Sequence, residues 1–217
     1  MASTLDGDLP LGKESEYVTT YTPSLLRSME RSGQRRLIGI DPENLPFLGE
    51  DVWTCYELTW LDADGCPQAA VLEIRVPCQS GAIVESKSLK LYLNSFAQTR
   101  FQNRAEVQSA LDSDLGLAFR SPVMVNLLEP DHVQQGMNQF PGTCLDSTRI
   151  AVHDFVPDPS VLETEHDDIT VHESLYTHLF RSVCPVTGQP DAATVFVEYV
   201  GPRIVRESLL LFLISYR

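Results

Sequence analysis

Two short segments of this 217-residue chain combine residue types that could carry out chemistry. The first is Glu85-Ser86-Lys87-Ser88-Leu89-Lys90, which stands where an apolar pattern predicts the beginning of a helix. The free N–H groups and the positive dipole of a helix N-terminus favour anions. Two lysines in the first turn act against that dipole and cost helix stability. The combination predicts a phosphate-binding site; the alternative is a solvated turn with Ser86 or Ser88 as its N-cap.

The second segment is Ser182-Val183-Cys184-Pro185-Val186-Thr187-Gly188-Gln189-Pro190-Asp191. A cysteine among Pro and Gly lies on irregular chain, where an exposed thiolate can act as a nucleophile. Asp191 could face that sulfur as an acid or base. The alternative is that Cys184 is a small buried apolar side chain, because its spacing from Asp191 is not specific. His178 reads as a sheet-face residue, with an activating base as the second interpretation.

The charge of the chain narrows the classes of partner. It carries 16 Lys and Arg against 30 Asp and Glu, a formal net charge of −14, which disfavours gripping RNA or DNA as a polymer. No run approaches the roughly 18 apolar residues of a membrane helix, and the N-terminus has no signal-peptide core. The five cysteines include no CxxC pair and the five histidines are scattered, so neither a disulfide framework nor a metal site is predicted. We expect a cytoplasmic protein.

The residues after position 50 predict a hairpin followed by two helices. Alternating apolar residues over 52–61 and 68–76 are typical of strands, with a turn between them. A helical period over 88–99 places apolar side chains on one face. Asn103 with Glu106 forms a capping-box pattern that opens a second helix. That helix has its own apolar face: Val107, Leu111, Leu115 and Ala118.

Further strands are predicted over 122–128 and 148–155, which gives a β-β-α-α-β-β unit. Residues 1–45 read as an N-terminal arm with one short helix over 23–29. We therefore expect three parts: the arm at 1–45, a first unit at 46–160, and the first part of a second unit at 161–217.

The second unit is expected because the pattern starts again about 120 residues later. Residues 88–96 match 208–216 with five identities in nine positions. Residues 65–70 match 188–193, and Tyr56 pairs with Tyr176. Three matches in the same order indicate a tandem duplication. The copies differ in two loops, one carrying residues 81–87 and the other Cys184, and loops carry function on a repeated scaffold.

The duplication also predicts that the second copy is truncated. It stops at Arg217, after its first helix, without a second helix or last two strands. Such a unit would leave sheet edges and an apolar face uncovered. We therefore expect that the chain is a piece of a longer protein, or that a separate piece completes it.

Taken together, the two segments resemble the 7-cyano-7-deazaguanine reductases, the nitrile reductases of queuosine biosynthesis. Residues 85–96 resemble the signature of that family, and 184–191 resemble its nucleophile segment. The flanking residues 44–47, 56–61 and 138–144 fit as well. The resemblance runs from about Leu11 to Arg217.

The resemblance implies an α+β protein of the tunnelling fold, a small antiparallel sheet with two helices on one face. The long form of the family carries two such units in tandem, which assemble into homodimers with active sites at unit interfaces. The implied reaction reduces the nitrile of 7-cyano-7-deazaguanine to the primary amine of 7-aminomethyl-7-deazaguanine, on the route to a modified tRNA nucleoside. It takes four electrons from two NADPH and needs no metal.

The family's roles carry over residue by residue. Cys184 would attack the nitrile carbon to give a covalent thioimide, and Asp191 would donate the proton that makes this attack productive. A thiol suits this step because it adds readily to a nitrile.

The resemblance assigns the first segment to the two ligands. Val84, Glu85 and Ser86 would line the deazaguanine site, with the Glu85 carboxylate accepting hydrogen bonds from the N–H edge of the base. Ser86 and Lys87 would also bind NADPH, which gives the predicted phosphate site a ligand.

One departure from the family is expected to matter. Family members continue with a His-Glu pair for the substrate and an Arg-Gly pair for NADPH, and this chain ends before both. If residues 1–217 were the whole protein, we would expect weak turnover or none. The alternative function is then a deazapurine-binding module. A zinc-dependent cyclohydrolase of the same fold is disfavoured because no Cys and His cluster surrounds Cys184.

Overall fold

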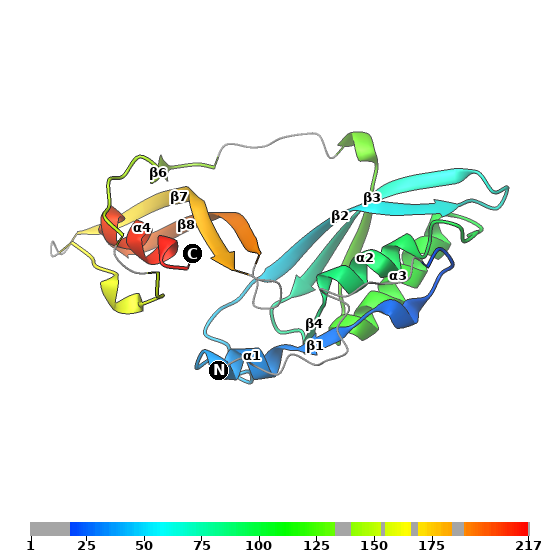
Figure 1. Ribbon diagram of the computed structural model, residues 1–217, viewed down its shortest axis with the longest axis horizontal. Helices are drawn as coiled ribbons and strands as arrows, with labels where there is room; N and C mark the ends of the chain where they lie inside the picture. Colours follow the sequence, from blue (N-terminus) through cyan, green and yellow to red (C-terminus); the bar gives the residue numbers. More distant parts are fainter. Residues whose placement is uncertain (1–17, 133–139, 153–154, 166–168, 184–188, 217) are drawn as a thin grey trace. The chain divides into compact units, whose positions relative to one another are not determined.

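The computed structural model describes residues 18–132, 140–152, 155–165, 169–183 and 189–216 (Figure 1). Helices and largely antiparallel strands are both present, which confirms the α+β class. The chain divides into two compact units, Met1–Gly136 and Met137–Arg217. The sequence predicts the end of the first unit at residue 160, so the structural division falls earlier.

The first unit is built on a three-stranded antiparallel sheet in the order β2-β3-β5. Its strands are β2 (Glu50–Leu61), β3 (Pro67–Pro77) and β5 (Met124–Leu128), and a 3₁₀ turn at Pro130–His132 follows. The predicted hairpin and the predicted strand over 122–128 are thus confirmed. The Asp62 carboxylate closes the hairpin by accepting from the N–H groups of Asp64 and Cys66 at 3.0 and 2.9 Å.

Two helices, α2 (Ser86–Asn94) and α3 (Arg104–Phe119), cover one face of this sheet (Figure 1). Asn103 Oδ1 accepts from Glu106 N at 3.0 Å, as the capping box predicts. Helix α2 ends five residues before the predicted end, where the Ser95 hydroxyl donates to Tyr92 O at 2.6 Å. The predicted apolar faces are buried in the core: Leu89, Tyr92, Leu93, Phe96, Val107, Leu111, Leu115 and Ala118.

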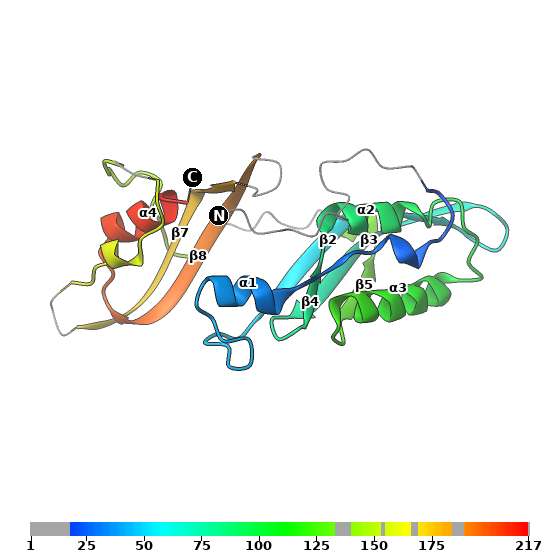
Figure 2. The same ribbon diagram turned by 60° about the horizontal axis from the view of Figure 1, so that its bottom comes forward.

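The segment before the sheet belongs to the first unit. A 3₁₀ turn at Pro23–Leu25 leads into β1 (Ser28–Glu30) and α1 (Arg31–Leu37), and β1 pairs antiparallel with β4 (Ala82–Val84; Figure 2). The predicted helix over 23–29 is therefore wrong beyond its first turn. Pairing with β4, about 54 residues away in the chain, outweighs the local helical preference.

Among its described residues, the second unit contains the three-stranded sheet β6-β7-β8 and the α-helix α4. Strands β7 (Thr170–Val183) and β8 (Pro190–Pro202) form a long antiparallel hairpin, and β6 (Thr143–Cys144) pairs parallel with β7. Helix α4 (Arg206–Ile214) packs on β7 (Figure 1). A small core joins them: Leu145, Leu175, Leu209, Leu210 and Ile214.

The strand predicted over 148–155 is wrong for its described residues, 148–152 and 155, which have no strand conformation. The alternating apolar residues Ile150 and Val152 pack on the second core from irregular chain. The edge of β7 is taken by β6 instead. This approach depends on Gly142, whose φ is +94° and whose Cβ, if present, would collide with the Ser174 carbonyl.

The two units repeat one local hydrogen-bond pattern at the start of a helix. In the first unit, Glu85 N donates to Arg27 O at 2.9 Å, and Arg27 N donates to Ser88 Oγ at 3.1 Å. The second unit repeats both bonds, at 2.9 and 3.0 Å, with these residues in the same order: Val205, Glu163 and Ser208. The 3₁₀ turn at Pro159–Val161 precedes this segment, as Pro23–Leu25 precedes the first.

Each hairpin also carries a β-bulge, between residues 55 and 58 in β2 and between 177 and 180 in β7. These bulges align Tyr56 with His178, so the predicted match of Tyr56 to Tyr176 is wrong by two residues. Counted from the bulges, the second hairpin loop is longer by one residue, rather than by the three that the matches of Tyr56 to Tyr176 and of 65–70 to 188–193 imply. The connection to the helix is longer in the first unit, where residues 78–85 separate β3 from α2, than in the second, where residues 203–205 separate β8 from α4.

Candidate functional site

The first predicted segment lies where β4 runs directly into α2. Val84 and Glu85 are only 1% and 3% exposed, Ser86 is exposed, and Lys87 is half-buried. Glu85 is the N-cap of α2, and its carboxylate accepts from Lys87 N at 3.0 Å and from Ser88 N at 2.6 Å. The serine N-cap of the alternative interpretation, Ser86 or Ser88, is therefore not observed. The Ser88 hydroxyl instead donates to Glu85 O at 2.7 Å.

The cap bonds fix both oxygens of the Glu85 carboxylate at the positive end of the helix dipole, where a negative charge is favoured. Each carboxylate oxygen can accept two hydrogen bonds, so acceptor capacity remains after the two cap bonds. A carboxylate held in this way presents a fixed pair of acceptors, which suits a planar ligand edge that carries two N–H donors.

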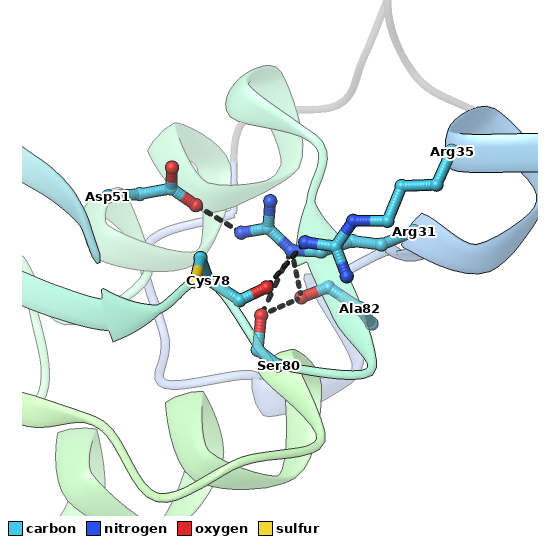
Figure 3. Close-up of polar contacts among 6 residues, drawn as sticks. All are labelled: Arg31, Arg35, Asp51, Cys78, Ser80 and Ala82. Atoms are coloured by element: carbon cyan, nitrogen blue, oxygen red, sulfur yellow. Dashed lines mark hydrogen bonds and ion pairs between the residues drawn. The ribbon is translucent and has the colours of Figure 1, made fainter. Parts of the chain in front are cut away.

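The loop between β3 and β4 is held in place by two arginines of α1 (Figure 3). Arg31 Nε donates to Ser80 Oγ at 2.9 Å and to Ala82 O at 3.4 Å, while its guanidinium pairs with Asp51 of β2. Arg35 donates to the carbonyl of the residue that follows β3. These contacts fix the entry to β4 and so the approach to Glu85. The signal in the sequence is the run of arginines over 27–36 in an acidic chain, which falls within the predicted N-terminal arm.

A pocket of about 360 Å³ opens between β2 and α2 next to this segment. Lys90 Nζ lies 3.4 Å from Glu57 Oε1 across it. Burial, together with the Glu57 charge, raises the pKa of the Cys55 thiol to about 11, which keeps it protonated near neutral pH. Nine residues line the pocket: Trp53, Thr54, Cys55, Glu57, Ser86, Lys87, Leu89, Lys90 and Leu93. The two lysines give it the donors that a phosphate group needs.

The second predicted segment is described only in part, since Cys184 lies outside the described residues. Asp191 is exposed on β8 and pairs with Ser182 of β7, and Val183 pairs with Pro190. The ladder thus brings the two chain segments that flank Cys184 side by side. His178 is confirmed as a sheet-face residue, with its Nδ1 2.8 Å from Thr194 Oγ1.

Among the described residues, the structure brings together only the predicted site residues of the first segment, because Cys184 of the second is not described. Val84 to Lys87 form one continuous segment at the start of α2, in the unit Met1–Gly136. Asp191 belongs to the unit Met137–Arg217. Within the described ranges no group of His, Cys, Asp and Glu could hold a metal ion. No described helix is long and apolar enough to cross a membrane.

Comparison with known proteins identifies the class to which this fold and site belong. Residues 17–127 match the family described as nitrile reductase, 7-cyano-7-deazaguanine reductase, N-terminal part. The chain therefore belongs to the 7-cyano-7-deazaguanine reductase family, which confirms the resemblance found in the sequence.

Two relatives extend the similarity over the second unit. The chain is 45% identical over 208 residues to the NADPH-dependent 7-cyano-7-deazaguanine reductase of Chromohalobacter salexigens, covering 96% of this chain and 74% of the relative. It is 44% identical over 209 residues to the NADPH-dependent 7-cyano-7-deazaguanine reductase of Saccharophagus degradans, covering 96% and 77%.

Proposed function

We propose that this protein reduces the nitrile of 7-cyano-7-deazaguanine to a primary amine, with NADPH as the reductant. The observation that carries the proposal is the identity of 44–45% over 96% of the chain to two reductases that bear this name. The buried carboxylate of Glu85 and the adjacent lysines support it, because they offer acceptors for a base edge and donors for a phosphate. Substitution of Glu85 or of either lysine should therefore affect the binding of the substrate or of NADPH.

In the proposed site the guanine-like edge of the substrate faces Glu85. That edge carries a ring N–H and an amino group, and both can donate to one carboxylate. The cap bonds from Lys87 N and Ser88 N hold the carboxylate in place before the substrate arrives. Val84 and Ser86 flank it on either side in the chain and complete the predicted contacts. A preorganised acceptor of this kind lowers the cost of binding.

The chemistry is proposed to begin at Cys184. The S–H bond breaks as Asp191 takes the thiol proton, the sulfur forms a bond to the nitrile carbon, and one π bond of the nitrile breaks. Asp191 then gives that proton to the nitrile nitrogen, which yields a thioimide. When bound, NADPH supplies hydride, and two of them deliver the four electrons that convert the nitrile to an amine. Asp191 is exposed on β8.

Ser86 and Lys87 are proposed to hold the phosphate groups of NADPH. Ser86 is exposed in the first turn of α2, and Lys87 lies beside it in the lining of the pocket between β2 and α2. The pocket fits this role by the chemistry of its donors, since two ammonium groups and a helix N-terminus favour anions.

We further propose that the chain consists of two tunnelling-fold units and acts as a homodimer. The repeated bonds at Arg27 and Glu163 support the first part. At the start of the helix, Val205 and Glu207 of the second unit occupy the positions of Glu85 and Lys87. Only the first unit therefore carries the proposed contacts to the base and to phosphate. Sedimentation equilibrium tests the dimer, and a single species at the mass of one chain would refute it.

The test of the function is the intact mass of the protein after incubation with 7-cyano-7-deazaguanine without NADPH. We expect a gain of one substrate molecule, lost in Cys184→Ala and retained in Cys66→Ala, which removes an exposed cysteine of the first unit. Adding NADPH should release the amine. No gain in mass would refute the covalent mechanism. Substrate binding without a gain in mass would instead indicate the alternative, a deazapurine-binding module.

A further inference from the structure

The bulge in β7 is held by one side chain from outside its own hairpin, together with a threonine of β7. The pairs Thr177 with Val195 and Phe180 with Ala193 leave two residues of β7 opposite Thr194 alone. A bulge of this kind takes backbone N–H groups out of the regular ladder, and buried N–H groups need other partners. The partners found here therefore decide where the bulge forms.

The carboxylate of Asp146 is the main partner of the groups at the bulge. Its Oδ1 accepts from the Thr177 hydroxyl at 2.7 Å and from His178 N at 3.1 Å. Thr177 Oγ1 in turn accepts from Leu179 N at 3.1 Å. Thr177 is fully buried, so its hydroxyl and the N–H groups around it would be costly to leave without these bonds.

Asp146 is itself fixed by the strand that precedes it. Leu145 is 1% exposed in the core of the second unit, and its N–H donates to Tyr176 O at 2.8 Å. Burial acts to raise the pKa of the Asp146 carboxyl, but the bonds from Thr177, His178 N and Cys144, with the charge of His178, outweigh it and lower the pKa. The carboxylate is therefore ionised near neutral pH, and charge-assisted bonds are stronger than neutral ones.

The bulge sets the register of everything that follows it in β7. Beyond the bulge, Ser182 pairs with Asp191 and Val183 pairs with Pro190. Side chains alternate between the two faces of a strand. A slip of one residue in the pairing of β7 with β8 would therefore move the Asp191 side chain to the other face of the sheet, relative to the side chains of β7. Cys184 comes next in the chain after Val183.

We propose that Asp146 is a positioning residue for the nitrile reduction: by holding the bulge at Thr177, it sets the register that pairs Asp191 with the end of β7. The inference rests on the proposed function, in which Asp191 protonates the nitrile nitrogen while Cys184 attacks the carbon. Asp146 acts on Asp191 indirectly, through its hydrogen bond to Thr177 and the backbone conformation of β7 that this bond maintains.

The experiment measures the rate of covalent adduct formation against 7-cyano-7-deazaguanine concentration in wild type, Asp146→Ala and Asp146→Asn. In Asp146→Ala we expect the limiting rate to fall about 10- to 100-fold, because small displacements of reacting groups cost that much. The half-saturating concentration should stay unchanged, since Glu85 lies in the other unit. Asp146→Asn keeps an acceptor oxygen and should recover the rate to within about threefold.

A matched control is Glu198→Gln, which also exchanges a carboxylate for an amide in this hairpin. Glu198 is exposed on β8 and contacts His172 at 2.7 Å, away from the bulge. Its adduct rate should equal that of wild type. If Asp146→Ala does not fold, Thr177→Val makes the same test, because it removes the hydroxyl at nearly constant volume, with Thr177→Ser as the rescuing variant.

Nuclear Overhauser contacts between Ser182 and Asp191 give a second readout that is independent of the reaction. They should be weakened or lost in Asp146→Ala and kept in Asp146→Asn and Glu198→Gln. Wild-type rates and contacts in Asp146→Ala would overturn the proposal. Failure of wild type to form an adduct would refute the proposed function alone, and the cross-strand contacts would still decide whether Asp146 sets the register.

Discussion

The hydroxyl of Tyr21 donates to Oδ2 of Asp114 at 2.6 Å, and the two residues are 93 positions apart in the chain. Tyr92 of α2 donates to the same oxygen at 2.7 Å. The carboxylate of α3 thus ties both α2 and the N-terminal segment to one point. The Tyr21 ring also packs edge-on against Phe96 at 5.0 Å and Phe101 at 5.9 Å. This anchoring explains why the segment before β1 is part of the first unit rather than a loose arm.

Removing the Tyr21 hydroxyl should weaken this anchor without disturbing the core. We expect Tyr21→Phe to lower the free energy of unfolding by about 1.5 kcal/mol, because a hydrogen bond to a charged acceptor is lost while the ring contacts remain. Urea denaturation followed by circular dichroism measures the change. Tyr56→Phe, at a tyrosine that is 68% exposed, is the control and should stay within about 0.5 kcal/mol of wild type.

The same cluster predicts a loss of stability at alkaline pH. Burial raises the pKa of Tyr21 and of Tyr92, and the hydrogen bonds to Asp114 and its charge raise both further. A raised folded-state pKa contributes stability that is fully present below the unfolded value of about 10 and is lost as pH rises beyond it. The free energy of unfolding should therefore fall above about pH 10, less steeply in Tyr92→Phe than in wild type. Equal slopes would contradict the assignment.

Local patterns in the sequence predicted the elements whose contacts are close in the chain. The hairpin of β2 and β3 and the buried face of α2 follow from periodicity, which each segment carries by itself. The pairing of β1 with β4 did not follow, because a three-residue strand has too few residues to show alternation. Its position depends on the Ser28 hydroxyl, which donates to Ala118 O at 2.7 Å, and on contacts that only the folded unit creates.

At the candidate site, residue types predicted a helix N-terminus but not its cap. Serine is the usual N-cap, yet Ser88 lies within the first turn and bonds to Glu85 O and Arg27 N instead. The longer side chain of Glu85 reaches the N–H groups of that turn. The role of Asp146 was invisible for a different reason. Its partners lie about 31 positions further along, and a bulge leaves no periodic signal.

The close approach of β6 to β7 predicts that Gly142 tolerates no side chain. Gly142→Ala should lower the stability of the second unit by about 2–3 kcal/mol, because alanine is strained at a φ of +94° and its Cβ would collide with the Ser174 carbonyl. Gly33→Ala is the control, since Gly33 lies in α1 with nothing within 4 Å of its Cβ position. It should be neutral or slightly stabilising. Hydrogen exchange measured for each unit separates the two effects.

The burial of Cys55 predicts that this thiol resists modification. With a pKa of about 11, roughly one Cys55 in a thousand is ionised at pH 8, whereas Cys66 is exposed at the hairpin turn. We expect a maleimide to modify Cys66 well before Cys55, as peptide mass mapping would show. In concentrated urea the two should react at similar rates. Comparable rates in the folded protein would contradict the burial of Cys55.

The repeated serine contacts predict that two substitutions, one in each unit, lower the free energy of unfolding by similar amounts but affect different amides. Ser88 Oγ accepts from Arg27 N at 3.1 Å and donates to Glu85 O, and Ser208 Oγ accepts from Glu163 N at 3.0 Å. Both serines are buried, so alanine at either position leaves a backbone N–H without its partner and should cost about 1–3 kcal/mol.

The measurement for this pair is amide hydrogen exchange at Arg27 and at Glu163. In Ser88→Ala the Arg27 amide should exchange faster while Glu163 keeps its protection, and Ser208→Ala should show the reverse. Ser109→Ala is the control, because Ser109 is exposed on α3 and its hydroxyl bonds only within its own helix turn at 2.9 Å. Faster exchange at both amides in either variant would mean that the two units do not open independently.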